Sequence, residues 1–277
     1  MGPDFLCVGA QKAGTGWLYE QLRSHPDFWM PPLKELHYFD RLGRARLERK
    51  SDRLRIARQN ARDQRDIQFV ERMEKLRSQE TVDFDGYAAL FEPKGALISG
   101  DITPGYSTLP DAMAGRITER FPSMKIIFLA RDPVERAWSQ LSMWVRHGVI
   151  APFAENDFDA VTQHLQRPEV MLRSHLTTIV ARWRHCVAHD SFGLYFFDDL
   201  KRDAAEVRSG IVQFLGGDAT KPSGALAVDH NPKGIKEKLR LNDAMRAHLA
   251  KFFENELKTC ATELGGSAVT WPARYRF

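Results

Sequence analysis

The feature that most constrains this chain is a short apolar run that leads directly into a glycine-rich loop. The run covers residues 5–8, and the loop reads GAQKAGTGWLY over residues 9–19. Residues 15–24 carry apolar side chains at helical spacing, which predicts a strand, a tight turn and a helix in succession. Backbone N–H groups at such a helix N-terminus bind a phosphate without help from side chains. The stretch therefore predicts a phosphate-binding loop.

The loop differs from a Walker A motif in the place of its lysine. A Walker A motif has two glycines five residues apart, followed by Lys and then Ser or Thr. Gly9 and Gly14 have this spacing, but the next residues are Thr15 and Gly16. The only lysine of the loop, Lys12, lies between the glycines. A kinase uses the later lysine with Mg²⁺ on its β- and γ-phosphates, so a P-loop nucleotide kinase is kept only as an alternative.

The rest of the chain alternates between strands and helices. Strands separated by helices predict an α/β fold with a P-loop-like central parallel sheet and helices on both faces. We take residues 1–277 as a single domain with a charged insertion at residues 41–80, where arginines alternate with acids. This pattern predicts one or two solvated helices, serving as a lid or a partner-binding arm. Further strands are expected at residues 96–101, 125–130 and 192–197, and helices at residues 111–121, 204–215 and 239–264.

Composition narrows the function classes. With 43% hydrophobic and 27% charged residues, the chain has the make-up of a globular protein. A formal net charge of +4 is too small to argue for nucleic acid as a partner. There is no run of about 18 apolar residues and no visible signal peptide, so we expect no membrane span. Three isolated cysteines without metal-ligand spacing favour a reducing, cytoplasmic compartment and predict no metal site.

A second pair of anion-binding residues follows the third predicted strand. Arg131 comes directly after residues 125–130, and Ser139 follows eight residues later. Ligands of open parallel sheets bind beyond the carboxyl ends of the strands. Arg131 offers a fork of donors for a phosphate, which Ser139 can share from the next helix. Lys12 and Arg131 are thus expected to face two phosphate groups of one ligand.

These stretches resemble those of sulfotransferases that use 3′-phosphoadenosine 5′-phosphosulfate (PAPS). GAQKAGTGWLY resembles their 5′-phosphosulfate-binding loop, and LARDPVERAWS resembles their 3′-phosphate-binding motif. PPLKELHYFD is similar to the K-E-x-H-F-F-D segment of the heparan-sulfate and related carbohydrate sulfotransferase branch. NPKG, residues 231–234, resembles the loop that closes over the nucleotide, and FGLYFFDDLKRDAAEVRSGIVQFLG is similar to a late segment of these enzymes.

The resemblance implies a reaction and a set of site residues. The chain would move the sulfuryl group of PAPS in line to a hydroxyl or amine of a carbohydrate or other small metabolite, leaving 3′,5′-ADP. Lys12 would stabilise the leaving phosphate, and Glu35 would act as general base. His37 would assist or replace Glu35, since it points the same way in an extended segment. The residues implied to bind the cofactor are Gln11, Lys12, Ala13, Gly14, Thr15, Gly16, Trp17, Arg131, Ser139, Lys233 and Gly234.

One departure from the branch affects the catalytic machinery. The branch has an acid-Lys-Ser-Pro segment after the second strand, where this chain reads DITP over residues 101–104. Ile102 replaces a lysine that assists catalysis, although Asp101 and Thr103 can still shape the site. The substitution leaves a non-catalytic nucleotide-binding relative, with the charged arm recruiting a partner, as a further alternative. Neither the acceptor nor the oligomeric state follows from the sequence. The candidates for a second cation are Arg173, Lys233 and Arg240. Lys34 is expected to be solvated, with a substrate or cofactor contact as the alternative.

Overall fold

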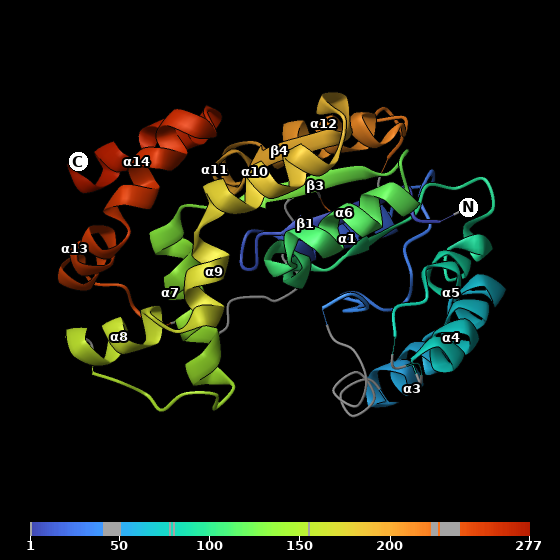
Figure 1. Ribbon diagram of the computed structural model, residues 1–277, viewed down its shortest axis with the longest axis horizontal. Coiled ribbons are helices and arrows are strands. Elements are labelled where there is room, and N and C mark those ends of the chain that lie inside the picture. The colour runs from blue at the N-terminus through green and yellow to red at the C-terminus, as the bar shows by residue number, and fades with distance from the viewer. Residues whose placement is uncertain are drawn as a thin grey trace.

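The computed structural model describes residues 2–40, 51–77, 79, 81–154, 156–222, 227 and 239–277, and Figure 1 shows how its elements are arranged. The strands are β1 (Phe5–Gly9), β2 (Gly100–Ile102), β3 (Lys125–Ala130) and β4 (Phe192–Phe196). The α-helices are α1 (Thr15–Arg23), α3 (Ser51–Gln59), α4 (Gln64–Leu76), α5 (Phe84–Ala89), α6 (Asp111–Arg120), α7 (Pro133–Arg146), α8 (Phe158–Leu165), α9 (Pro168–Ser174), α10 (Leu176–Cys186), α11 (Phe197–Arg202), α12 (Ala204–Leu215), α13 (Asp243–Phe252) and α14 (Glu254–Glu263). Short 3-10 helices are η1 (Glu92–Lys94), η2 (Pro104–Thr108), η3 (His189–Ser191), η4 (Gly266–Thr270) and η5 (Pro272–Tyr275).

The four strands form one parallel sheet in the order β2-β1-β3-β4. β1 lies between β2 and β3, with Leu6 opposite both Asp101 and Ile126. Every residue of β1 is buried, as an uninterrupted apolar run predicts for a strand covered on both faces. The predicted α/β fold with a central parallel sheet is therefore confirmed.

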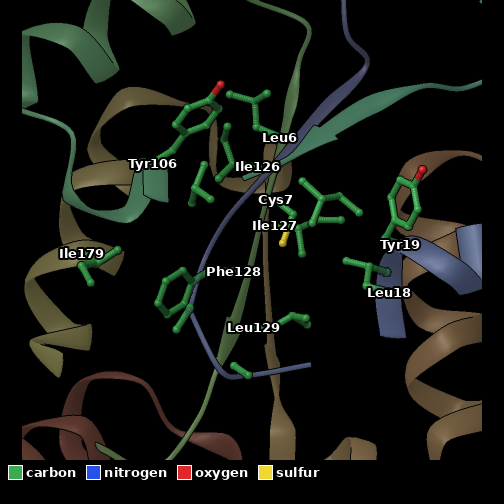
Figure 2. Close-up of a cluster of buried hydrophobic side chains, with 14 of the residues drawn as sticks. Leu6, Cys7, Leu18, Tyr19, Tyr106, Ile126, Ile127, Phe128, Leu129 and Ile179 are labelled. Carbon is green, nitrogen blue, oxygen red and sulfur yellow. The ribbon is translucent and has the colours of Figure 1, made fainter. Parts of the chain in front are cut away.

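Helices cover both faces of this sheet (Figure 2). Leu18 and Tyr19 of α1 lie on one face, whereas Tyr106 of η2 and Ile179 of α10 lie on the other. α12 packs against α1, and α6 packs against α10, so each face carries a pair of packed helices. In the described part of the chain, no helix is both long enough and apolar enough to cross a membrane.

Strand β2 starts later than the sequence predicts. The apolar pattern places a strand at residues 96–101, but pairing with β1 runs only from Gly100 to Ile102. The N–H of Ile98 donates instead to the carbonyl of Asp27, and the carbonyl of Ile98 accepts from the N–H of Trp29. Because these backbone groups already have partners, the first half of the predicted strand does not need β1 to satisfy its hydrogen bonds.

The single long helix predicted at residues 239–264 is wrong. The segment contains α13 and α14, which are separated at Phe253. Phe253 is buried, and its backbone (φ −99°, ψ 13°) departs from helical geometry. α13 packs against α7 while α14 packs against α10, so the two halves bury their apolar faces on different helices. A helical pattern in sequence does not distinguish one straight helix from two that meet at a buried residue.

The charged insertion packs onto the rest of the chain at one end of the molecule, opposite α8 and α13 (Figure 1). Its described part consists mainly of α3 and α4, while residues 41–50 lie outside the described residues. The expectation of solvated helices is wrong for one face, because Phe69 and Val70 belong to the hydrophobic core that also contains the sheet. The ring of Phe69 lies 6.1 Å from that of Trp29, between centroids.

A buried carboxylate connects the insertion to the rest of the domain through hydrogen bonds. Asp66 on α4 is fully buried and accepts two hydrogen bonds of 2.8 Å from the guanidinium of Arg62. It also accepts a hydrogen bond of 3.1 Å from the indole N–H of Trp29, and Arg62 donates to the carbonyl of Met30 at 2.7 Å. Trp29 and Met30 lie shortly before Glu35 in the chain, so the insertion holds the stretch that leads to the candidate base.

We predict that Asp66→Asn lowers the free energy of unfolding by about 2 kcal/mol, because an amide cannot accept the full set of charged and indole hydrogen bonds. Urea denaturation of the wild type and the variant measures this difference. Asp52→Asn is the matched control, since Asp52 lies on the same insertion with a side chain 84% exposed. The control should change stability by less than about 0.5 kcal/mol. Equal effects of the two substitutions would contradict this account of the insertion.

Candidate active site

The phosphate-binding loop begins where β1 ends and is closed by the N-terminus of α1. Gly14 caps α1 in the left-handed conformation (φ 93°), and a Cβ at this position would lie 2.8 Å from the side chain of Leu200. Glycine adopts this conformation without steric cost, and any larger residue would also displace the end of the Leu200 side chain. Lys12 has a positive φ of 74°, which is unusual for a residue with a side chain. The first N–H groups of α1 have no partner within the helix, and such groups favour an anion.

Arg131 joins this loop to the neighbouring strand. It directly follows β3, and its Nη1 donates a hydrogen bond of 2.7 Å to the carbonyl of Lys12. Its guanidinium lies over the ring of Phe197, 4.6 Å from the centroid. The Nε of Arg131 is buried and has no hydrogen-bond partner among the residues that the structure describes. The two motifs expected on neighbouring strands thus meet, and Arg131 retains a buried donor.

The other residues implied to bind the cofactor are placed less uniformly. Ser139 lies on α7, the helix that starts next to Arg131, and is partly buried. Lys233 and Gly234 lie outside the described residues, so their assignment stays a prediction. Within the loop and α1, Ala13, Thr15 and Trp17 are buried, whereas Gln11, Lys12, Gly14 and Gly16 are partly exposed.

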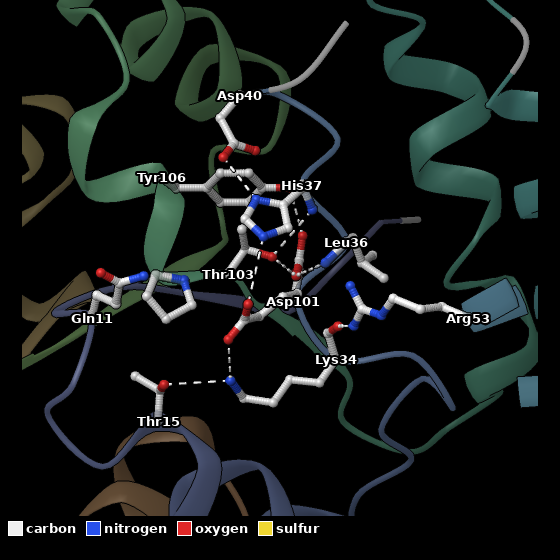
Figure 3. A network of polar contacts seen from close by, with 12 residues as sticks. Gln11, Thr15, Lys34, Leu36, His37, Asp40, Arg53, Asp101, Thr103 and Tyr106 are labelled. Carbon is white, nitrogen blue, oxygen red and sulfur yellow. Dashed lines mark hydrogen bonds and ion pairs between the residues drawn. The ribbon is translucent and has the colours of Figure 1, made fainter. Parts of the chain in front are cut away.

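A second group of polar side chains faces the loop from the segment that ends at Asp40 (Figure 3). Lys34 Nζ lies 2.8 Å from Glu35 Oε1 and 3.4 Å from Oγ1 of Thr15, the first residue of α1. His37 lies between two carboxylates, with its Nε2 3.5 Å from Glu35 Oε2 and its Nδ1 2.8 Å from Asp40 Oδ2. The expectation of a solvated Lys34 is wrong, because its side chain is only 21% exposed. A continuous row of polar contacts therefore connects the loop with Glu35 and His37.

The backbone of this segment is strained rather than extended. Glu35 has a φ of 61° and His37 a φ of 51°, so the predicted extended conformation is wrong, although the two side chains still meet. Among the described residues, four other than glycine have a positive φ, and three of them are the candidate catalytic residues Lys12, Glu35 and His37. Such strain persists where the surrounding structure enforces it, and it clusters at functional sites. The coincidence supports all three assignments.

Asp101 holds the strained segment against the sheet. It is buried in the middle of β2, where its Oδ1 accepts from the hydroxyl of Thr103 at 2.6 Å and from the N–H of Leu36 at 3.5 Å. Its Oδ2 accepts from the hydroxyls of Tyr106 at 2.8 Å and Tyr87 at 3.1 Å. Burial and the charge of Asp101 raise the pKa of both tyrosines well above the ordinary value, so both remain donors. Leu36, between the two strained residues, is thereby fixed.

Glu35 is held in its ionised form. Partial burial acts to raise the pKa of its carboxyl, but the hydrogen bond with His37 and the charge of Lys34 outweigh burial and hold the pKa well below the usual range. The carboxyl group is therefore ionised at neutral pH, which is the form that a general base requires. Its affinity for that proton increases when the charge of Lys34 is shared with another anion, since the opposing positive charge is then partly neutralised.

The three candidates for a second cation fall in different places. Arg173 reaches the loop from α9, where its Nη1 donates a hydrogen bond of 3.0 Å to Gln11 Oε1. Arg240 is exposed, and Lys233 lies outside the described residues. The sequence interpretation kept a substrate or cofactor contact only as the alternative for Lys34 and did not count it among the second cations, although it stands directly before the candidate base in the chain.

The start of α7 is anchored by residues near the C-terminus. Asp132 caps α7 by accepting a hydrogen bond of 2.9 Å from the N–H of Val134, and it accepts another of 2.7 Å from the hydroxyl of Tyr275. Arg274 lies 3.7 Å from the same carboxylate. Burial raises the pKa of Asp132 to about 6, although these hydrogen bonds oppose the rise. The residue next to Arg131 is therefore a buried carboxyl group that ionises near neutral pH.

Comparison with known proteins gives a consistent result. A family model described as the Sulfotransferase family matches residues 3–221. The membrane-associated sulfotransferase kil1 of Dictyostelium discoideum is 24% identical over 176 residues, which are 62% of this chain and 30% of that protein. The chain thus spans less than a third of the length of this relative.

Solved structures share the fold. A sulfotransferase from Alicyclobacillus acidocaldarius superposes with a TM-score of 0.66 at 21% identity, covering 98% of this chain and 99% of the other. The sulfotransferase domain of the Synechococcus PCC 7002 olefin synthase superposes with a TM-score of 0.53 at 18% identity, covering 91% and 94%. At these identities the likeness shows the fold.

We predict that Asp132→Asn flattens the pH dependence of stability. The folded protein, with a pKa of about 6 at Asp132, binds more protons than the unfolded chain, whose aspartate pKa is about 3.9. The free energy of unfolding of the wild type should therefore fall as pH rises from about 4 to 7, by about 2 to 3 kcal/mol relative to the variant. Asparagine keeps an oxygen to cap α7. Urea denaturation across this pH range measures the difference.

Asp159→Asn, at an exposed position of α8, is the control and should follow the wild-type curve. If the Asp132→Asn and wild-type curves run parallel, Asp132 does not titrate in this range.

Proposed function

The chain belongs to the sulfotransferase family, and from this premise we propose that it transfers a sulfuryl group from PAPS to an acceptor hydroxyl or amine. The donor would lie along the carboxyl ends of β1 and β3, with its 5′-phosphosulfate at the loop of Lys12 and its 3′-phosphate at Arg131 and Ser139. The acceptor would be a carbohydrate or another small metabolite, as the similarity of residues 31–40 to the carbohydrate branch implies.

The residues present fit an anionic nucleotide. The N-terminus of α1, where no side chain caps the helix, lies next to Lys12, and the buried Nε of Arg131 is a donor that has no partner among the described residues. Burial lowers the pKa of Arg131 despite the opposing charge of Glu135, but a guanidinium stays protonated at neutral pH. Two cationic side chains on adjacent strands match the two ends of a molecule that carries phosphate groups at its 3′ and 5′ positions.

The observation that carries the proposal is the position of Glu35. One ammonium group, that of Lys34, contacts both the Glu35 carboxylate and Thr15 at the start of α1. A carboxylate that is ionised at neutral pH is therefore connected to the phosphate-binding loop through a single ammonium group. General base catalysis requires such a group within reach of the attacking atom.

The roles of the side chains follow from this arrangement. Bound PAPS supplies an activated sulfuryl group, whose sulfur forms a bond to the acceptor oxygen or nitrogen while its bond to the bridging oxygen of the 5′-phosphate breaks. The Glu35 carboxylate takes the proton that the acceptor loses, and His37 orients that carboxylate through its Nε2. Lys12 and the N–H groups at the start of α1 stabilise negative charge on the 5′-phosphate that departs as part of 3′,5′-ADP.

We predict that 3′,5′-ADP stabilises the protein more than ADP with Mg²⁺ does. At 100 times its dissociation constant, a ligand adds about 2.7 kcal/mol, which corresponds to a rise in melting temperature of about 5 °C or more. Arg131→Ala and Lys12→Ala should remove most of this rise, because each deletes a cation that faces a phosphate. Arg146→Ala, at the exposed end of α7, is the control and should retain it. Stabilisation by ADP with Mg²⁺ alone would favour the kinase alternative.

We predict that Glu35→Gln lowers kcat by about 10²- to 10⁴-fold while the protein still binds 3′,5′-ADP, because the amide removes the base and leaves the nucleotide contacts in place. Transfer of label from ³⁵S-labelled PAPS to molecules of a cell extract measures the rate and reveals the acceptor. Glu71→Gln, on the charged insertion with a side chain 50% exposed, is the matched control. Binding of 3′,5′-ADP without transfer by the wild type, together with indifference to Glu35→Gln, would support a non-catalytic relative.

A further inference from the structure

We infer that Lys34 supplies the second cation of this active site, in place of the lysine that Ile102 has replaced, and that it acts directly on the transferred group. The inference rests on the proposed function and assigns one of its catalytic residues. The presence of Ile102 is then no argument for a non-catalytic protein, because another segment of the same site supplies the missing positive charge.

The position of the ammonium group is the first argument. Lys34 Nζ lies between the loop and the base, 3.4 Å from Thr15 Oγ1 and 2.8 Å from Glu35 Oε1 (Figure 3). The proposed reaction joins a donor at the loop to an acceptor at the base. A side chain that touches both places is next to the path along which the sulfuryl group moves.

The spare donor capacity of Lys34 is the second argument. An ammonium group has three N–H donors, and two are accounted for by Thr15 and Glu35 among the described residues. The third is left for an anionic oxygen. Lysine acts as a compact point charge on a flexible stem, so it can follow a group that moves between donor and acceptor.

The burial of Ile102 is the third argument. Ile102 lies in β2 opposite Cys7, is 2% exposed, and belongs to the hydrophobic core. Its neighbour Asp101 accepts hydrogen bonds from the hydroxyl of Thr103 and from the N–H of Leu36. The polar side chains next to Ile102 therefore contact the segment that carries Lys34. In this chain the strand contributes apolar packing where the branch has a cation, and the facing segment contributes the charge.

The chemistry of the step links Lys34 to Glu35. As the acceptor oxygen or nitrogen bonds to sulfur, its proton passes to the Glu35 carboxylate and the electron pair of the breaking bond passes to the 5′-phosphate oxygen. The negative charge beside Lys34 therefore disappears at Glu35 while new negative charge develops on the side of Thr15. Lys34 is already in contact with both places, so its ammonium group stabilises the new negative charge without moving.

The charged insertion contributes to this placement. The Nη2 of Arg53 on α3 donates a hydrogen bond to the main-chain carbonyl of Lys34. The backbone that carries the ammonium group is thus fixed by the insertion, while the side chain extends toward the loop (Figure 3).

The test compares Lys34→Met, which keeps the length of the stem, with Lys34→Arg, which keeps the charge. We expect Lys34→Met to lower the rate of transfer from PAPS by about 100-fold, within the range for loss of one donor that stabilises a transition state. Lys34→Arg should recover a large part of this loss. Lys251→Met, at a side chain 79% exposed, is the control and should retain the wild-type rate.

Binding gives a readout that is independent of turnover. Titration calorimetry should show Lys34→Met weakening PAPS by at least about fivefold while 3′,5′-ADP, which lacks the sulfuryl group, changes by less than about twofold. Equal affinities of wild type and Lys34→Met for PAPS would overturn direct contact with the transferred group.

A double variant separates this role from mere support of the base. Slow hydrolysis of PAPS without acceptor is measured for Glu35→Gln and for Glu35→Gln combined with Lys34→Met. A further loss of about tenfold or more in the double variant is expected if Lys34 acts on the donor. No further loss would overturn the inference, because Lys34 would then act only through Glu35. A wild type that neither binds 3′,5′-ADP nor cleaves PAPS would instead refute the proposed function itself.

Discussion

The carboxylate of Asp101 is the contact on which the candidate site depends. It is buried in β2 and gathers the hydroxyls of Thr103, Tyr87 and Tyr106 together with the N–H of Leu36. An ionised carboxylate in a buried position needs such a full set of donors, since an uncompensated buried charge is costly. The same set of donors brings the segment of Glu35 to the carboxyl end of the sheet, beside the loop that follows β1. One buried charge in a strand therefore helps to determine where the candidate general base lies.

The strain at Glu35 and His37 is offset by burial of the residues between and after them. A non-glycine residue in the left-handed region costs of the order of 1 to 3 kcal/mol. Leu36 and Tyr38 are almost completely inaccessible to solvent, and the ring of Tyr38 stacks on that of Tyr87 at 5.1 Å. Buried apolar residues thus alternate with polar residues that point into the site. The core holds the segment in place, which lets the two catalytic candidates adopt a conformation that isolated residues would avoid.

The sequence predicts the sheet, the loop and the placement of Lys12 and Arg131 after neighbouring strands because those features are local: an apolar run, a glycine spacing and a motif that directly follows a strand. It does not predict the contact of Lys34 with Thr15, because the two are brought together only by the fold of the intervening chain. The positive φ values of Glu35 and His37 are also invisible in the sequence, since neither residue type favours that conformation. The break at Phe253 has the same origin, because packing against different helices overrides a continuous helical pattern.

The charged insertion shows how a pattern typical of a solvated helix can serve a site. Two of its arginines donate to main-chain carbonyls of the segment before the candidate base: Arg62 bonds to Met30, and Arg53 bonds to Lys34. A carbonyl in an irregular segment has no strand or helix partner, so a guanidinium with several donors can satisfy it and fix its direction. The insertion therefore restrains the backbone at two positions that lead to the candidate base, Met30 and Lys34. The sequence does not reveal this role, because an arginine that faces solvent cannot be distinguished in sequence from one that donates to a backbone carbonyl.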